Sequence, residues 1–375
     1  MSKVVVGMSG GVDSAVAAYL LKQQGYEVIG VMLRTWDSTA QECTLNKQSS
    51  DLDVVQNKCC EIDDASDVAK MLGIEFHAFN AVSEFRSHVV EPFICEYANA
   101  RTPNPCIECN RYVKFEKLLY FANVLGADFI ATGHYAKKVK LPNGRYTVQK
   151  SDALKKDQTY MLYKLSQEEL ERVLFPLGEY DKSEIREIAK EAGIPVAEKK
   201  DSQEICFIPD DDYAGFIKKN ISCVTNKYDT GLNPFSPGDF IDKDGNVLGK
   251  HNGLIHYTIG QRKGLGIAMG HPVYVCKLIP ENNQVLIGDE EDLYSDSILV
   301  RDYNFLSIPD LNTGDFVEGI VKIRYHHAGE KAVITKTNDD ILSISFENPV
   351  KSPTPGQSAV FYDTDGCVIG GGIII

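Results

Sequence analysis

The chain has 375 residues, of which 43% are hydrophobic and 25% charged, and its formal net charge at pH 7 is −14. This length predicts roughly two or three domains, and the composition is that of a soluble globular protein. No apolar stretch is long enough to span a bilayer, and the N-terminus lacks the apolar region of a signal peptide. We therefore expect a cytoplasmic protein with no membrane partner.

The charge is unevenly distributed along the chain. Taken alone, a balance of −14 argues against a nucleic-acid partner, because phosphate binding depends on Lys and Arg. The segment from Ala100 to Leu165, however, holds twelve Lys and Arg residues against five Asp and Glu. A second segment, Gly249 to Lys277, holds four basic residues and no acidic one. Such tracts are compatible with docking a polyanion on one face, although they are also common on ordinary solvated surface.

The first half of the chain alternates strand and helix patterns. We expect a buried strand over residues 3–8, a helix from Ser14 and a second strand from Glu27. Further helices are expected from Asp63 and from Val113, each followed by an apolar strand. This alternation predicts an α/β fold with a doubly wound, mostly parallel sheet, in which ligands bind beyond the carboxyl ends of the strands. That rule singles out residues 7–14, the residues after Val31, and the turn at residues 132–134.

The pattern changes after about residue 210. Short strand-like runs with D-G, N-N and P-G turn signals take over, which is typical of antiparallel sheets or small barrels. We place one domain boundary near residue 210 and a softer one near residue 285. The predicted domains are residues 1–210, 211–285 and 286–375.

The hexapeptide SGGVDS, Ser9 to Ser14, lies between the first predicted strand and helix, where amide groups and the helix dipole hold anions. It is not a Walker motif, because the Gly-Lys-Ser/Thr ending is absent. A glycine turn that only links strand to helix is the alternative. In its context the hexapeptide resembles the PP-loop of the ATP pyrophosphatases. That resemblance implies ATP cleavage between the α and β phosphates, with Mg²⁺ shared between the phosphates and Asp13, and adenylation of a substrate oxygen.

Ten cysteines in a cytoplasmic chain are expected to be reduced, so those near polar residues are candidates for catalysis or metal binding. Cys106 and Cys109 occur in RTPNPCIECNRYVKF, which predicts a proline-rich loop leading into a basic helix. We expect the helix dipole and nearby basic side chains to favour the thiolate of Cys109. Cys206 also has polar neighbours in the sequence. The adjacent Cys59 and Cys60 are interpreted as structural or incidental.

Seven segments together resemble one family, the tRNA-specific 2-thiouridylases (MnmA family). In chain order they are SGGVDS, TPNP-x-x-x-CN, ATGHYA, KDQTYMLY, DSQEICFIPD, YTIGQRKGLG and PGQSAVFY. They extend over nearly the whole chain, and chance agreement in order and spacing is negligible. The resemblance implies a PP-loop domain, a small central domain and a C-terminal β-barrel that binds tRNA. It also implies an ATP-dependent sulfurtransferase that replaces O2 of the wobble uridine of tRNA with sulfur.

The resemblance also assigns residues. It implies that Cys109 is the catalytic nucleophile and Cys206 the persulfide carrier. The implied ATP contacts are Gly7, Met8, Ser9, Gly10, Gly11, Val12, Asp13, Ser14, Leu33 and Gly133, with Met32 as the alternative to Leu33. The implied tRNA contacts are Asn104, Pro105 and Cys106 for the target base, and His134, Lys156, Asp157, Gln158, Arg324, Tyr325 and Gln357 elsewhere. His134 is alternatively a capping residue, and Arg324 with Tyr325 is alternatively an ordinary strand pair.

The implied reaction begins with adenylation of O2 on a uridine flipped out of its stack. A cysteine desulfurase or sulfur-relay protein supplies a persulfide on Cys206. This persulfide either attacks C2 directly or is released as sulfide by Cys109. Both routes expel AMP and leave a disulfide between the two cysteines, which an external reductant must reset. We expect tRNA binding to bring the two thiols together.

Cys106 departs from the family pattern, since many members carry Asp at this position. The resulting C-x-x-C, together with Cys206, supplies three thiols (Cys106, Cys109 and Cys206) for a 4Fe–4S cluster with one iron open to sulfide. The cluster route and the persulfide route both stay open at this point. Two other functions stay open as well. One is an amidating ligase that uses the same loop without a cysteine pair, and the other is an RNA-binding protein whose ATP loop is vestigial.

Overall fold

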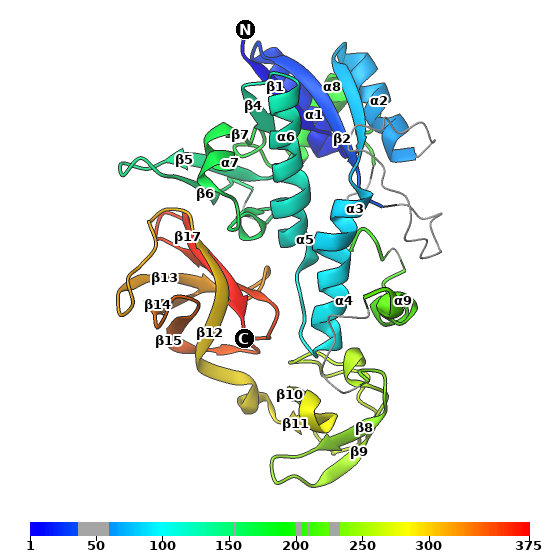
Figure 1. The fold of residues 1–375 in the computed structure, drawn as a ribbon, viewed down its shortest axis with the longest axis vertical. Helices are drawn as coiled ribbons and strands as arrows, with labels where there is room; N and C mark the ends of the chain where they lie inside the picture. The colour runs from blue at the N-terminus through cyan, green and yellow to red at the C-terminus, as the bar shows by residue number, and fades with distance from the viewer. Residues whose placement is uncertain (37–59, 154, 200–204, 209, 225–232) are drawn as a thin grey trace.

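The computed structural model describes residues 1–36, 60–153, 155–199, 205–208, 210–224 and 233–375 of the chain (Figure 1). Its N-terminal part contains a five-stranded, wholly parallel sheet in the order β3-β2-β1-β4-β7. The strands are β1 (Lys3–Gly7), β2 (Glu27–Arg34), β3 (Glu75–Asn80), β4 (Phe129–Ala131) and β7 (Val173–Leu174). The parallel pairing confirms the α/β sheet predicted from the sequence.

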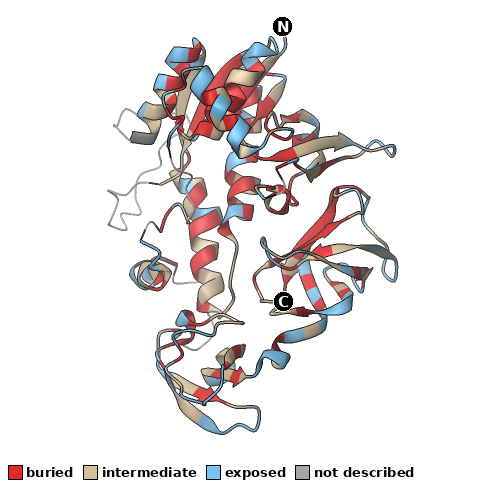
Figure 2. Ribbon diagram, turned by 180° about the vertical axis from the view of Figure 1, so that it is seen from behind, coloured by how far each residue is buried: buried red, intermediate tan, exposed pale blue. Residues whose placement is uncertain are grey.

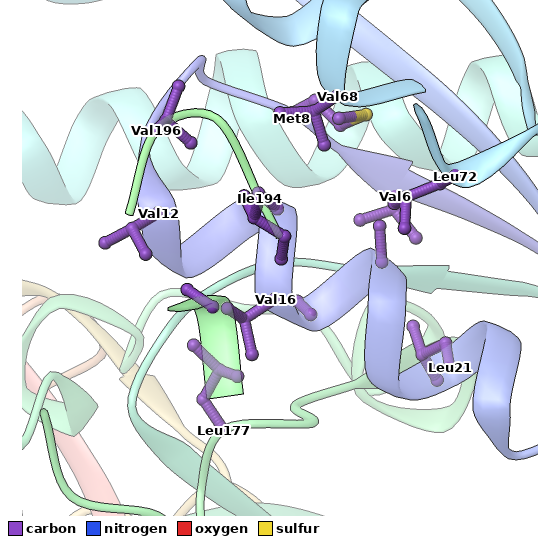
Figure 3. Packing of buried hydrophobic residues seen from close by; sticks show 14 of the residues in the cluster. Val6, Met8, Val12, Val16, Leu21, Val68, Leu72, Leu177, Ile194 and Val196 are labelled. Atoms are coloured by element: carbon purple, nitrogen blue, oxygen red, sulfur yellow. The ribbon is translucent and has the colours of Figure 1, made fainter. Parts of the chain in front are cut away.

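Helices cover both faces of this sheet. One face carries α1 (Val12–Gln23), α2 (Cys60–Leu72) and α8 (Lys182–Glu191), and the other carries α6 (Glu116–Val124). Val4 and Val6 of β1 pack into the first layer and Val5 into the second, because successive side chains of a strand alternate. Figure 3 shows the first layer, where Val12 and Val16 of α1 pack in the same cluster as Val6. Burial on both faces explains why β1 is a continuous apolar run.

A long helix carries Cys106 and Cys109. It continues through α5 (Pro105–Glu108), the π-helical stretch η2 (Cys109–Phe115) and α6. A helix was expected only from Val113, so the expected loop around the cysteines is wrong and these residues form the first turns of the helix. Asn104 caps the helix by accepting a hydrogen bond from the Cys106 amide at 3.2 Å, and Pro105 takes the first helical position. Asn followed by Pro is a helix-start signal, which the prediction overlooked.

A second row of helices lies beside this long helix in Figure 1. It consists of α3 (Val82–Phe85), the π-helical η1 (Arg86–Val90) and α4 (Glu91–Ala98). On the other side of the long helix, the hairpin of β5 (Ala136–Lys140) and β6 (Tyr146–Lys150) and the short helix α7 (Gln167–Arg172) lie between the sheet and the C-terminal strands.

The C-terminal half is built from mostly antiparallel strands. A four-stranded sheet in the order β10-β11-β8-β9 is followed by a closed barrel in the order β12-β15-β14-β13-β16-β17. The sheet strands are β8 (Gly238–Ile241), β9 (Val247–His251), β10 (Tyr274–Ile279) and β11 (Gln284–Gly288). The barrel strands are β12 (Tyr294–Phe305), β13 (Phe316–Lys322), β14 (Glu330–Lys336), β15 (Leu342–Lys351), β16 (Ser358–Tyr362) and β17 (Val368–Ile374). The barrel confirms the predicted fold, whereas the helix α9 (Tyr213–Asn220) that precedes these strands was not expected.

The barrel packs firmly against the N-terminal part. One hydrophobic cluster contains residues of the sheet, the fully buried Tyr160 and Tyr163, and Tyr362 of β16. The Tyr160 hydroxyl donates to the Ser358 carbonyl at 2.7 Å, and the Asn304 amide donates to the Tyr163 carbonyl at 2.8 Å. Buried residues accordingly fill the sheet layers and the barrel, while exposed residues follow the outer edges (Figure 2). Among the described residues, no helix is both long enough and apolar enough to cross a bilayer.

Candidate functional site

The SGGVDS segment forms a compact turn at the carboxyl end of β1. Gly10 has a φ of 70°, a left-handed conformation that glycine adopts without strain. The Ser9 amide donates to Ser14 Oγ at 3.1 Å, and this hydroxyl donates to the Gly11 carbonyl at 3.1 Å. Gly11 is the N-cap of α1 and supplies no side-chain cap, so no cap occupies the first amide groups of the helix. The turn therefore has the geometry of an anion site.

Basic residues from distant parts of the chain converge on this turn. Lys182 Nζ, at the start of α8, lies 2.8 Å from both carboxylate oxygens of Asp13, and the Tyr135 hydroxyl donates to Asp13 Oδ1 at 2.7 Å. Lys199 Nζ donates to the Gly10 carbonyl at 3.2 Å. Lys182 and Lys199 lie outside the motifs found in the sequence, and Tyr135 lies within ATGHYA, where no role was predicted for it. Because Asp13 is already paired, a Mg²⁺ ion at this carboxylate would have to displace Lys182, so Asp13 as placed does not fit a metal ligand.

The residues predicted to contact ATP outside the turn lie at neighbouring strand ends. A Cβ atom at Gly133 would lie 2.8 Å from both the Asp13 carbonyl carbon and the Ser14 nitrogen, so only glycine fits there. At the end of β2 the Met32 side chain is 5% exposed and packs into the core, whereas Leu33 is half-buried. This difference favours Leu33 over Met32 as a surface for a ligand. Gly7 ends β1, and the side chains of Met8 and Val12 are buried, which leaves only their backbone to a nucleotide.

Cys109 lies inside the long helix and not before its start. Its side chain is 8% exposed, and burial raises the pKa of its thiol, while the nearby Lys114 acts in the opposite direction. The expectation that the helix dipole favours the Cys109 thiolate is therefore wrong, because Cys109 is one turn into the helix and desolvation is the larger effect. Cys106, which is exposed in the first turn, is the thiol nearest the helix start.

Cys206 is brought near Cys109 by the residues that follow it. Phe207 and Ile208 are each 2% exposed and belong to the same hydrophobic cluster as Cys109. Cys206 itself is exposed at the surface, yet the protein atoms on its other sides and the thiols of Cys109 and Cys106 raise its pKa to about 12. Charges act on each other's pKa only over short distances, so the three thiols lie in one region. All three are free cysteines.

Lys114 links the thiols to the phosphate turn. Its charge lowers the pKa values of Cys109, Cys206 and His134, in each case as a smaller effect than burial. His134 follows Gly133, which packs on the turn. Lys114 is therefore within electrostatic range of both reactive thiols and of His134.

Three of the predicted tRNA contacts, Pro105, His134 and Asp157, are buried. His134 and Asp157 are each 8% exposed. His134 Nδ1 lies 2.7 Å from Thr132 Oγ1, and Asp157 accepts a hydrogen bond from the Thr159 hydroxyl at 2.7 Å. Burial lowers the pKa of His134 well below its ordinary value and raises that of Asp157. The His134 ring is therefore held inside the protein by a side-chain contact, and its role stays a prediction.

The other predicted tRNA contacts are partly exposed, but several make internal hydrogen bonds. Gln158 accepts from the Tyr135 amide at 2.9 Å, and Arg324, exposed in the loop after β13, donates to the Lys351 carbonyl at 2.9 Å. Lys156 is half-buried. Part of each of these three side chains is therefore accessible to an RNA.

Tyr325 and Gln357 join the barrel to the N-terminal part. The Tyr325 hydroxyl donates to the Asp157 carbonyl at 2.9 Å, and Gln357 Nε2 donates to the Thr102 carbonyl at 2.8 Å. Thr102 lies just before Asn104, whose side chain also contacts Met161 Sδ at 3.5 Å. The residues predicted to hold the target base are therefore positioned by contacts from two other parts of the fold.

The three thiols do not form a metal site as placed. In the part of the chain that the structure describes, no three His, Cys, Asp or Glu side chains converge so as to hold a metal ion. Cys106 is exposed and Cys109 buried on the same helix, so the two sulfurs have different surroundings. A 4Fe–4S cluster on Cys106, Cys109 and Cys206 therefore does not fit this arrangement. The helix α2 begins at Cys60, whereas Cys59 lies outside the described residues.

Comparison with known proteins gives one consistent result. Three family models match in succession: "tRNA methyl transferase HUP domain" over residues 2–210, "tRNA methyl transferase PRC-barrel domain" over 231–289, and "Aminomethyltransferase beta-barrel domain" over 295–374. The tRNA-specific 2-thiouridylase MnmA of Lachnoclostridium phytofermentans is 49% identical over 380 residues, which is 100% of both chains. The corresponding proteins of Caldanaerobacter subterraneus subsp. tengcongensis and Clostridium perfringens are each 47% identical, covering 100% and 99% of this chain and 98% of their own.

A likeness to solved structures is weak. The U34-tRNA thiolase NcsA of Methanococcus maripaludis, solved with its 4Fe–4S cluster, is 16% identical with a TM-score of 0.33, covering 60% of this chain and 67% of its own. Similarity at this level does not establish any functional property of the present chain.

Proposed function

Because the chain belongs to the tRNA-specific 2-thiouridylase (MnmA) family, we propose how its own residues perform the ATP-dependent transfer of sulfur to a tRNA uridine. The family-model descriptions use methyl transferase names, but the full-length relatives are thiouridylases. The observation that carries the proposal is that Phe207 and Ile208, which follow Cys206, pack in the same hydrophobic cluster as Cys109, in a protein whose residues 9–14 form an anion site. Two thiols and an anion site in one protein suit sulfur transfer to an adenylated base.

The nucleotide step uses the turn at residues 9–14. Its amide and hydroxyl groups would hold the phosphates of ATP, and Lys182 and Lys199 would supply positive charge beside them. Adenylation of uridine O2 makes that oxygen part of a good leaving group. Mg²⁺, when bound, neutralises phosphate charge.

The sulfur step divides the work between an exposed and a buried thiol. Cys206 is exposed, so a cysteine desulfurase or sulfur-relay protein can reach it to form the persulfide. Its terminal sulfur replaces the adenylated O2 at C2, and AMP leaves with the bonding electrons. Cys109 then attacks the Cys206 sulfur, which frees the thiocarbonyl and leaves a Cys109–Cys206 disulfide for an external reductant. Release of sulfide by Cys109 before attack on C2 gives the same products. We propose this persulfide route rather than the cluster route, because the thiols do not fit a metal site.

The tRNA would lie across the N-terminal part and the barrel. Asn104, Pro105 and Cys106 at the helix start are proposed to contact the wobble uridine, and Lys156, Gln158 and Arg324 to contact other parts of the tRNA. Tyr325 and Gln357 are proposed to act through the contacts that hold the barrel in place. We also propose that the chain is divided into domains 1–210, 211–285 and 286–375. We propose a cytoplasmic location, because tRNA and reduced thiols occur there.

The test is a reconstituted reaction containing ATP, Mg²⁺, cysteine, a cysteine desulfurase and unmodified tRNA, followed by mass analysis of nucleosides. We expect a mass gain of sulfur for oxygen on uridine, lost in Cys109→Ser and in Cys206→Ser. Cys276→Ser, in β10 of the central sheet, is the matched control and should keep activity. Unchanged uridine with an active desulfurase would refute the proposal. A double variant at Cys109 and Cys206 that retains full ATP-dependent turnover would favour the amidating ligase instead.

A further inference from the structure

We propose that Asp302 of the barrel is a positioning residue for the cysteine segment, defined as residues 101–111, and that it acts through Lys164 and Glu108. In this proposal the contact sets the rate of sulfur transfer and contributes little to tRNA affinity. The inference rests on the function proposed above, because it assigns a role within that reaction.

The first observation is a buried cation between the two parts of the molecule. The Lys164 side chain is 3% exposed, and its Nζ lies 2.7 Å from Glu108 Oε1 and also contacts the carboxylate of Asp302. Glu108 is on α5 immediately before Cys109, whereas Asp302 is on β12 of the barrel. A buried ammonium group is costly unless it is paired, so both carboxylates are held in place by Lys164.

The second observation is the backbone of Asp302. Its φ is 47°, a left-handed conformation that is uncommon for a residue other than glycine. The register of β12 against β17 shifts between Arg301 and Asn304, so residues 302 and 303 together face one residue, Gly372. This is a β-bulge, a device that redirects a side chain out of the regular alternation. Here the redirected carboxylate is the one that contacts Lys164, which explains why a strained conformation is kept at this position.

The third observation is that the barrel holds the other end of the cysteine segment as well. The Thr102 amide donates to the Pro355 carbonyl at 2.8 Å, and its carbonyl accepts from Gln357 Nε2 at 2.8 Å. Near the opposite end, Arg111 Nη1 lies 3.9 Å from Asp302 Oδ1. The segment that contains both thiols of the C-x-x-C is therefore fixed to the barrel before Cys106 and after Cys109.

Such contacts affect rate more than binding. Misplacement of a reacting group by about 1 Å costs on the order of a hundredfold in rate, even when the substrate still binds. Glu108 and the half-exposed Asp302 both contact the Lys164 ammonium, so their charges are paired within the protein. Removing the charge of Asp302 should therefore let Cys106 and Cys109 move out of their reactive positions, while the residues proposed to contact tRNA stay in place.

The experiment uses the full-length enzyme with Asp302→Asn, which keeps the side-chain size and the tolerance for a left-handed backbone but removes the charge. We expect kcat for thiolation to fall roughly tenfold, as for loss of a hydrogen bond between charged groups, with KM for tRNA changed by less than about twofold. Hydrogen–deuterium exchange should increase in peptides covering residues 101–111 and stay unchanged in β13.

The matched control is Asp310→Asn. Asp310 also pairs with a buried lysine, Lys336, at 2.7 Å, and the exposed fractions of the two pairs are similar, 6% and 58% against 3% and 52%. This pair lies wholly within the barrel and does not touch the cysteine segment. We expect the control to change neither kcat nor exchange at residues 101–111.

Three results would overturn the proposal. They are a raised KM with unchanged kcat in Asp302→Asn, no change in either constant, and a lower kcat without faster exchange in the cysteine segment. The exchange measurement needs no tRNA, so it is independent of the reaction. Lack of thiolation by the unmodified enzyme would instead refute the proposed function.

Discussion

At the residue scale, burial decides the state of the two reactive thiols. Cys109 is nearly enclosed, whereas Cys206 is exposed at the surface but close enough to other protein atoms for its pKa to be raised. Desolvation is the largest cause of the raised pKa in both, and the positive charge of Lys114 only partly offsets it. In the absence of tRNA and donor, both sulfurs are therefore protonated at neutral pH. Protonated thiols resist oxidation, which suits residues that must wait for a substrate.

This state predicts the pH dependence of thiol modification. A thiol whose pKa is raised loses its proton only at higher pH, so the thiolate fraction of Cys206 should still increase about tenfold per pH unit between pH 8 and 10. The measurement is the rate of iodoacetamide alkylation of the Cys206 peptide, determined by mass spectrometry. The same peptide in the unfolded chain serves as the control and should level off near pH 10, about one unit above the ordinary pKa of a thiol. A plateau below pH 9 in the folded protein would contradict the prediction.

At the element scale, the end of β4 and the start of α1 are in direct backbone contact. Gly133 has no room for a side chain because the opposing atoms, the Asp13 carbonyl carbon and the Ser14 nitrogen, belong to the backbone of the phosphate turn. The residue Gly133 after β4 thus packs against the backbone of the turn, and Lys182 at the start of α8 pairs with the Asp13 carboxylate. The turn keeps its shape through contacts with three separate elements.

Gly133→Ala should therefore displace the phosphate turn. We expect ATP-dependent pyrophosphate release to fall by about a hundredfold, with a loss of roughly 1–3 kcal/mol in the free energy of unfolding from overpacking. Pyrophosphate assays and denaturant titration measure the two effects. Gly249→Ala in β9 is the control, since an added Cβ there meets only one atom, at 4.0 Å. Full activity in Gly133→Ala would show that the turn tolerates the displacement.

At the scale of the whole molecule, an acidic protein must bind a polyanion. The net charge of −14 opposes tRNA binding, so affinity has to come from local basic groups, for which Lys156 and Arg324 are our proposed candidates. The barrel and the N-terminal part share one hydrophobic cluster and several hydrogen bonds. A tRNA that contacts both would therefore meet a surface that is already assembled.

Salt should weaken tRNA binding strongly, because counterions are released from phosphates on association. We expect Lys156→Gln to weaken binding at low salt and to reduce the slope of log K against log salt concentration by about one. Fluorescence anisotropy with labelled tRNA at several salt concentrations measures the slope. Lys331→Gln is the control, because this lysine is 76% exposed on β14 of the barrel and outside the proposed tRNA surface. An equal reduction of the slope in both variants would show that Lys156 is not a specific part of the proposed tRNA surface.

Local signals in the sequence were sufficient for the parallel sheet, the strand–turn–helix around SGGVDS and the C-terminal barrel, because strand alternation, helix periodicity and turn residues act over a few neighbours. The helix start at Asn104 and Pro105 was also encoded locally, although the prediction placed it at Val113. Only the tertiary structure decided which side chains surround the site. Lys182 reaches Asp13 across 169 residues, and Lys164 reaches Asp302 across 138. It likewise decided that Cys109 is buried and protonated rather than activated by a helix dipole. Such properties depend on how distant segments pack, and the free energy of a charge depends on the atoms around it rather than on its neighbours in the chain.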